Sequence, residues 1–121
     1  MATILTVDDS PSMRQMIRMT LEPAGHSVIE AGDGAQGLAK AQASKPDMVI
    51  TDLNMPVMNG LDLIRALRKQ TTLTGLPIVF LTTESSDGVK QEAKSAGATG
   101  WITKPFVPAQ LLAVVGKLVR S

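Results

Sequence analysis

The sequence predicts an α/β fold built on a parallel β-sheet. Short apolar runs with the length of buried strands alternate with segments whose apolar residues recur at helical spacing, and this alternation is typical of βαβ units. The length of 121 residues fits one domain with an ordinary hydrophobic core. Five strands are predicted, over residues 4–7, 27–31, 48–51, 78–81 and 101–103.

The first two predicted helices are marked by their ends as well as by their periodicity. Ser10 can cap the first helix, with Pro11 at its first position, and Pro23 helps to end it. Asp33 can cap the second helix, which stops near Pro46. The predicted apolar face of the first helix comprises Met13, Met16, Ile17 and Leu21.

The other three predicted helices follow the later strands. Residues 54–60 are expected to form a loop, because they contain a proline and an Asn-Gly pair. A third helix follows, and Ser86 or Asp87 opens a fourth that ends at Gly97. The third helix has the apolar residues Leu61, Leu63, Ile64 and Leu67. The last helix opens at Pro108 and has the apolar residues Leu111, Leu112, Val115, Leu118 and Val119.

Polar residues follow four of the predicted strands. They are Asp8 and Asp9, Asp52, Thr82, and Lys104. If the strands are parallel, these side chains meet at one edge of the sheet, where open α/β sheets bind their ligands. Three clustered carboxylates need a countercharge, and a hard divalent cation with oxygen ligands is the usual one. An acidic metal site beside a lysine and a threonine favours phosphoryl chemistry.

Four short motifs occur at residues 7–10 (VDDS), 51–60 (TDLNMPVMNG), 81–83 (LTT) and 103–105 (TKP). In this order and at these distances they resemble the receiver domain of bacterial two-component response regulators, most closely the CheY-like stand-alone chemotaxis regulators. The likeness covers the whole chain. It implies a doubly wound, flavodoxin-like sheet with strand order 2-1-3-4-5, in a single receiver domain over residues 1–121.

The resemblance assigns a role to each residue of the predicted site. Asp52 would be the phosphoacceptor, and Lys104, preceding a cis proline, would pair with a phosphoryl oxygen. Asp9 would bind Mg²⁺ directly and Asp8 partly through water, with Asp52 and the backbone carbonyl of Asn54 completing the protein ligands. Taken alone, Asp52 would more simply be a turn aspartate and Lys104 a solvated surface lysine.

The resemblance also implies a switch and a means of resetting it. Thr82 would turn toward the phosphoryl group, and Trp101, where the family usually has a smaller aromatic residue, would change rotamer in response. A static aromatic residue is an equally good interpretation of Trp101. Asn54 and Glu84 would flank the water that removes the phosphoryl group. Thr83 is larger than the residue usual at its position and would restrict access to the phosphate.

The expected function is a phosphorylation switch in a two-component system, with a histidine kinase as donor. The chain would catalyse its own phosphorylation and dephosphorylation rather than act as a conventional enzyme. Its output would be protein binding through the face formed by the fourth helix, fifth strand and fifth helix. A chemotaxis role is favoured, with a flagellar motor component as a candidate partner, and a single-domain phosphorelay intermediate is the alternative.

Two other classes are weaker alternatives. An aspartyl phosphatase would place a second aspartate two residues after Asp52 as general acid, but Asn54 stands there and cannot deliver a proton. A flavin-binding electron carrier of the same topology would need a hydroxyl- and glycine-rich phosphate loop after the first strand. The carboxylates of Asp8 and Asp9 at this place would repel a phosphate.

Composition excludes several further classes. The absence of cysteine excludes a disulfide framework and a thiolate zinc site, and it fits a cytoplasmic location. No stretch has the length or hydropathy of a membrane span or a signal peptide. Nucleic-acid binding is not expected, because no run of Lys and Arg is longer than Arg68-Lys69 and the only aromatic residues are Phe80, Trp101 and Phe106.

Overall fold

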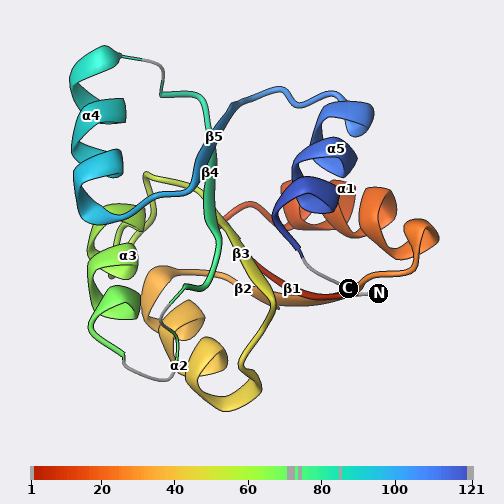
Figure 1. Ribbon diagram of the computed structural model, residues 1–121, viewed down its shortest axis with the longest axis horizontal. Coiled ribbons are helices and arrows are strands. Elements are labelled where there is room, and N and C mark those ends of the chain that lie inside the picture. Colours follow the sequence, from red (N-terminus) through yellow and green to blue (C-terminus); the bar gives the residue numbers. More distant parts are fainter. Residues whose placement is uncertain (1, 71–72, 74, 85, 120–121) are drawn as a thin grey trace.

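A central five-stranded parallel sheet organises the chain (Figure 1). The computed structural model describes residues 2–70, 73, 75–84 and 86–119. The strand order is β2-β1-β3-β4-β5, so the predicted fold class and the order 2-1-3-4-5 are confirmed. The strands are β1 (Thr3–Val7), β2 (Ser27–Ala31), β3 (Met48–Thr51), β4 (Ile78–Thr82) and β5 (Gly100–Thr103).

Helices cover both faces of this sheet. In Figure 1, α2, α3 and α4 lie on one side of the sheet, and α1 and α5 lie on the other. The helices are α1 (Pro11–Leu21), α2 (Gly34–Ser44), α3 (Gly60–Arg68), α4 (Asp87–Ala96) and α5 (Pro108–Leu118), and a 3₁₀ turn, η1 (Glu22–Ala24), follows α1. This three-layer arrangement is the one expected for alternating strands and helices.

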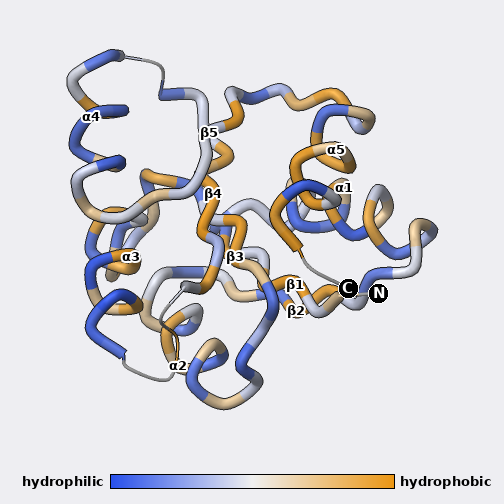
Figure 2. Tube along the Cα trace, viewed as in Figure 1, coloured by the Kyte–Doolittle hydropathy of each residue, from blue (hydrophilic) through white to orange (hydrophobic). Residues whose placement is uncertain are grey.

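Each face of the sheet carries its own hydrophobic core. Leu5 and Phe80 belong to the core beneath α2, α3 and α4, where Leu63 is fully buried. Ile4 belongs to the opposite core, with Ile17 of α1 and Leu111 of α5. The two cores share no residue. The central strands β3 and β4 are buried along their whole length and are hydrophobic in Figure 2. Burial on both faces explains why they appear in the sequence as continuous apolar runs.

Side-chain caps fix where the helices begin. The Oγ of Ser10 accepts a hydrogen bond from the amide of Met13 at 3.2 Å, and a carboxylate oxygen of Asp33 accepts one from the amide of Gln36 at 2.8 Å. Both predicted caps are therefore confirmed. Of the two residues predicted to open the fourth helix, Ser86 is the cap and Asp87 the first helical residue.

Several predicted details are wrong by small amounts. The sequence predicts Met16 on the buried face of the first helix, but it is 48% exposed because it lies at the edge of the apolar stripe. The sequence predicts Val119 within the last helix, but its backbone is extended and it follows the end of that helix. The third helix begins at Gly60, one residue earlier than expected, because Asn59 caps it. Thr82 is the last residue of β4 rather than the first residue after it.

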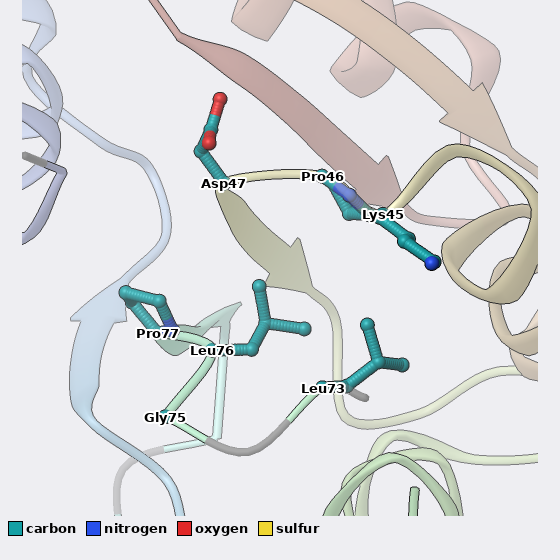
Figure 3. A pocket seen from close by; sticks show the side chains of 7 residues that line it. All are labelled: Lys45, Pro46, Asp47, Leu73, Gly75, Leu76 and Pro77. Atoms are coloured by element: carbon teal, nitrogen blue, oxygen red, sulfur yellow. The ribbon is translucent and has the colours of Figure 1, made fainter. Parts of the chain in front are cut away.

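The two edges of the sheet differ in chemistry. At the edge where β3 and β4 begin, a hollow of about 250 Å³ opens, and Figure 3 shows the side chains that line it. It is lined by Lys45, Pro46, Asp47, Leu73, Gly75, Leu76 and Pro77. The residues predicted to form the site follow the opposite ends of the strands. Among the described residues, no helix has the length and apolar character needed to cross a membrane.

Candidate phosphoacceptor and metal site

Lys104 joins two carboxylates at the carboxyl-terminal edge of the sheet. Its Nζ lies 2.9 Å from Oδ2 of Asp8 and 3.0 Å from Oδ2 of Asp52. Asp8 follows β1, Asp52 follows β3 and Lys104 follows β5, so side chains distant in sequence meet because the strands are parallel. The lysine side chain is only 12% exposed, so the contacts are screened less than a surface ion pair.

Asp8 is the most buried carboxylate of the site, at 2% exposure. Its Oδ1 accepts a hydrogen bond from the amide of Ser10 at 2.9 Å, and its Oδ2 accepts the one from Lys104. Burial raises the pKa of Asp8, and these two hydrogen bonds oppose that rise without cancelling it. The carboxylate is therefore held in a place where its negative charge is only partly compensated.

Lys104 is held by its backbone as well as by its ion pairs. Its amide donates a hydrogen bond to the carbonyl of Thr82 at 2.8 Å, and the following bond to Pro105 is cis, as the resemblance implied. Burial lowers the pKa of the ammonium, but the hydrogen bonds and charges of Asp8 and Asp52 outweigh it, and the net pKa is raised. Lys104 thus stays cationic at neutral pH.

Asp52 presents its carboxylate to the same edge from a loop. Its Oδ1 accepts a hydrogen bond from the amide of Leu53 at 2.7 Å, which fixes the orientation of the group. Its own amide donates to the carbonyl of Val7 at 2.9 Å, which continues the ladder between β1 and β3 past the end of the strand. The carboxylate remains 12% exposed, so a small reactant can reach it.

The donor set fits a hard divalent cation. Asp8, Asp9 and Asp52 can each offer one carboxylate oxygen, and these oxygens lie within 4.8 Å of one another. Asp9 is exposed, so a cation bound there would keep water ligands, as Mg²⁺ prefers. The raised pKa of Asp8 means that burial disfavours its charged form, and a bound cation would stabilise that charge. Asn54 lies two residues after Asp52 in the same exposed loop.

The residues predicted to form the switch lie on the neighbouring strands. Thr82 is fully buried, and its Oγ1 accepts a hydrogen bond from the amide of Glu84 at 3.3 Å, while Thr83 is exposed. Thr82 pairs with Thr103, and Phe80 pairs with Trp101. Because side chains alternate along strands, Thr82 and Trp101 are diagonal neighbours on the sheet face covered by α3 and α4.

Trp101 packs within this face rather than beside the carboxylates. Its ring lies 5.5 Å from that of Phe80, between centroids, and Lys90 of α4 places its Nζ 5.9 Å from the centroid of the indole ring. The side chain is half-buried, and its Nε1 is buried without a hydrogen-bond partner among the described residues.

Arg14 is a residue of the site that the sequence did not indicate. Its Nη1 donates a hydrogen bond to the backbone carbonyl of Asp8 at 2.5 Å, and its Nε forms an ion pair with Glu30 at 3.0 Å. The guanidinium thus fixes the end of β1, from which Asp8 projects. Arg14 looks like any exposed residue of an amphipathic helix in the sequence, and only the packing of α1 beside β2 reveals the contact.

Comparisons with known proteins agree with this geometry. The model of the response regulator receiver domain family matches residues 4–116. Protein PilH of Pseudomonas aeruginosa is 36% identical over 121 residues, which are 100% of both proteins. The structure of the chemotaxis protein CheY4 of Vibrio cholerae is 49% identical, covers 98% of this chain and 99% of its own, and superposes with a TM-score of 0.94.

A third comparison concerns the metal. The receiver domain of a Pseudomonas aeruginosa sensor histidine kinase, solved with a magnesium ion coordinated in its active site cleft, is 28% identical with a TM-score of 0.91, over 99% of this chain and 98% of that one. The chain also spans about half the length of several transcriptional regulators that it matches. The fold, the acidic edge of the sheet and these matches together show that this chain belongs to the response regulator receiver domain family.

Proposed function

We propose that this chain is a phosphorylation-activated switch in which Asp52 accepts a phosphoryl group from a histidine kinase. The observation that carries the proposal is the meeting of three carboxylates with Lys104 at one edge of the sheet. Asp52 pairs with Lys104, remains 12% exposed so that a small reactant can reach it, and is oriented by the amide of Leu53. Residues 1–121 would act as one receiver domain.

In the proposed reaction, a carboxylate oxygen of Asp52 attacks the phosphorus of a phosphohistidine and an acyl phosphate forms. The P–N bond breaks, and its electrons return to the histidine nitrogen, which takes up a proton from water. Lys104, already 3.0 Å from Asp52, would pair with a phosphoryl oxygen and keep the transferred group in place.

The metal ligands that we propose are Asp9, Asp8 partly through water, Asp52, and the backbone carbonyl of Asn54. Mg²⁺ bound by them supplies positive charge to the transferring phosphoryl oxygens. Without a cation, Asp8 and Asp9 would repel the incoming phosphoryl group, because both oxygens lie close to that of Asp52. These residues therefore make transfer dependent on the metal.

The test is incubation with a small acyl phosphate, such as acetyl phosphate, with and without Mg²⁺. We expect the chain to retain one phosphoryl group when Mg²⁺ is present, as detected by intact mass. Catalytic turnover of the donor without retained label would instead indicate an aspartyl phosphatase. No reaction under either condition would contradict the proposed function.

We propose chemotaxis as the pathway, supported by the 49% identity to CheY4. The output would be protein binding through the face formed by α4, β5 and α5, and a flagellar motor component is the partner that this pathway suggests. A single-domain phosphorelay intermediate is the second candidate, because the match to Protein PilH also extends over the whole length of both chains. Co-purification of partners with the phosphorylated and unphosphorylated chain would distinguish the two.

In the proposed switch, a movement of the Thr82 side chain causes a movement of Trp101. If Thr82 turns toward the phosphoryl group, it vacates space on the face that it shares with Trp101, and burial of an aromatic ring is worth about 2–3 kcal/mol. Beryllofluoride with Mg²⁺, a phosphoryl mimic, is expected to change the emission of Trp101, and Thr82→Ala is expected to reduce that change.

Thr83→Ala is the matched control for this experiment. Thr83 is the neighbouring threonine but is exposed, so its replacement should leave the emission change intact. An equal spectral shift in Thr82→Ala would break the proposed link between the two residues. No shift in the wild type, with binding of the mimic established by fluorine NMR, would make Trp101 a static aromatic residue.

Three further residues are proposed to set the lifetime of the acyl phosphate. Asn54 and Glu84 lie two residues after Asp52 and Thr82, so both are on the edge where water would approach. Their polar side chains would flank the attacking water. Thr83, which is exposed and directly precedes Glu84, would restrict its access.

A further inference from the structure

The loop after Asp52 contains a strained turn. The amide of Met58 donates a hydrogen bond to the carbonyl of Pro56 at 2.7 Å, so the chain reverses over three residues. The central residue, Val57, has a φ of 69°. A three-residue turn with positive φ is rare and strained, and a β-branched residue is poorly suited to it. Val57 is 83% exposed, so packing of its side chain does not explain the strain.

Gly34 holds this turn from the neighbouring helix. Gly34 is the first residue of α2, and its amide donates a hydrogen bond to the carbonyl of Met58 at 3.1 Å. A Cβ at position 34 would lie 2.8 Å from the Cβ of Met58 and closer still to its carbonyl oxygen. Only glycine permits this approach of the two backbones. Asp33 caps α2 immediately before it, so the donor amide is itself fixed in place.

The loop over residues 53–60, which contains the strained turn, includes residues of the proposed site. The amide of Gly60 donates to the carbonyl of Leu53 at 2.8 Å, which closes residues 53–60 into a compact loop. This loop starts next to Asp52 and contains Asn54. With its base closed by one hydrogen bond and its far side tied to α2 by another, the loop has little freedom to move. A shift of Met58 would therefore be passed to the backbone of Asn54.

We propose that Gly34 is a positioning residue of the phosphoacceptor site, which holds the strained turn at Val57 and so fixes the loop that binds Mg²⁺. This inference rests on the proposed function, because it assigns Asp52 and Asn54 to the metal site. Strained backbone of this kind persists only where its surroundings determine it, and the contact of Gly34 with Met58 is such a determinant.

The first test uses the wild-type chain. Because coupling between two sites is reciprocal, Mg²⁺ binding should slow hydrogen exchange of the Gly34 amide by about fivefold or more. The amide of Gly37 is the matched control, since it donates to the carbonyl of Asp33 within the same helix at 2.9 Å. An NMR titration records both amides together with the resonances of Asp9 and Asp52.

The outcomes of this test separate the two proposals. If Mg²⁺ leaves the resonances of Asp9 and Asp52 unchanged, the proposed metal site is wrong. If those resonances shift while Gly34 and Gly37 exchange as before, the metal site stands and the role of Gly34 is overturned. Selective protection of Gly34 supports the inference.

The second test uses variants. Gly34→Ala is expected to weaken Mg²⁺ binding by about tenfold or more, the usual effect of losing a residue that orients metal ligands. Adding Val57→Gly, which lets the turn adapt, should restore part of the affinity. Gly97→Ala is the matched control, because Gly97 has a φ of 111° and a Cβ there would lie 2.9 Å from Nε of Arg68. It should lower stability and leave Mg²⁺ affinity unchanged; wild-type Mg²⁺ affinity in folded Gly34→Ala would overturn the proposal.

Discussion

Replacing Asp52 by asparagine is expected to abolish acceptance of a phosphoryl group. An amide oxygen is a poor nucleophile and cannot form a stable acyl phosphate, so the bond to phosphorus has no acceptor. Asp8 and Asp9 would remain in place, and Asp8 would still pair with Lys104 at 2.9 Å. The expected loss is therefore chemical rather than structural. Intact mass after incubation with acetyl phosphate and Mg²⁺ measures it directly.

Asp47→Asn is the matched control. Asp47 is a carboxylate at the opposite edge of the sheet, where its Oδ2 accepts a hydrogen bond from the amide of Thr3 at 2.8 Å. Its replacement changes the net charge by the same amount and should leave labelling at the wild-type level. Wild-type labelling of Asp52→Asn, with the label found on another residue by peptide mapping, would refute the assignment of Asp52.

The sequence is sufficient to predict which residues gather at the site, because the direction of the strands alone decides it. Asp8, Asp52 and Lys104 each follow a predicted strand, and parallel strands end at the same edge. The helix caps were equally local, since Ser10 and Asp33 contact amides three residues away. Such contacts depend on short stretches of sequence and can be inferred without knowing the tertiary structure.

Contacts between elements cannot be inferred from short stretches of sequence. The hydrogen bond from Arg14 to the carbonyl of Asp8 depends on the rotation of α1 against the sheet. The contact of Gly34 with Met58 depends on how closely α2 approaches the loop after β3. The exposure of Met16 depends on the width of the face that α1 buries. In each case residue type and spacing leave several packings open, and the tertiary fold selects one.

Asp8→Asn is expected to stabilise the metal-free protein at neutral pH. Burial raises the pKa of Asp8 in the folded state, so folding favours its protonated form. The protonated carboxyl group therefore contributes to the stability of the folded state. This contribution is fully present below the unfolded pKa, about 3.9, and is lost as the pH rises through the folded pKa. Above that range the wild type retains a poorly compensated buried charge, which the amide does not carry. We expect a gain on the order of 1 kcal/mol, or roughly 4 °C in Tm.

The effect should reverse when Mg²⁺ is added. A ligand that binds only the folded state stabilises it by RT ln(1 + [L]/Kd), so Mg²⁺ should raise the Tm of the wild type more than that of Asp8→Asn. Asp9→Asn is the matched control, because Asp9 is exposed: its replacement should also reduce the gain from Mg²⁺, yet bring little stability without it. Thermal unfolding between pH 4 and 8, with Mg²⁺ or with EDTA, measures both effects. An Asp8→Asn variant less stable than wild type at pH 7 in EDTA would show that the ion pair with Lys104, rather than burial, dominates the energetics of this carboxylate.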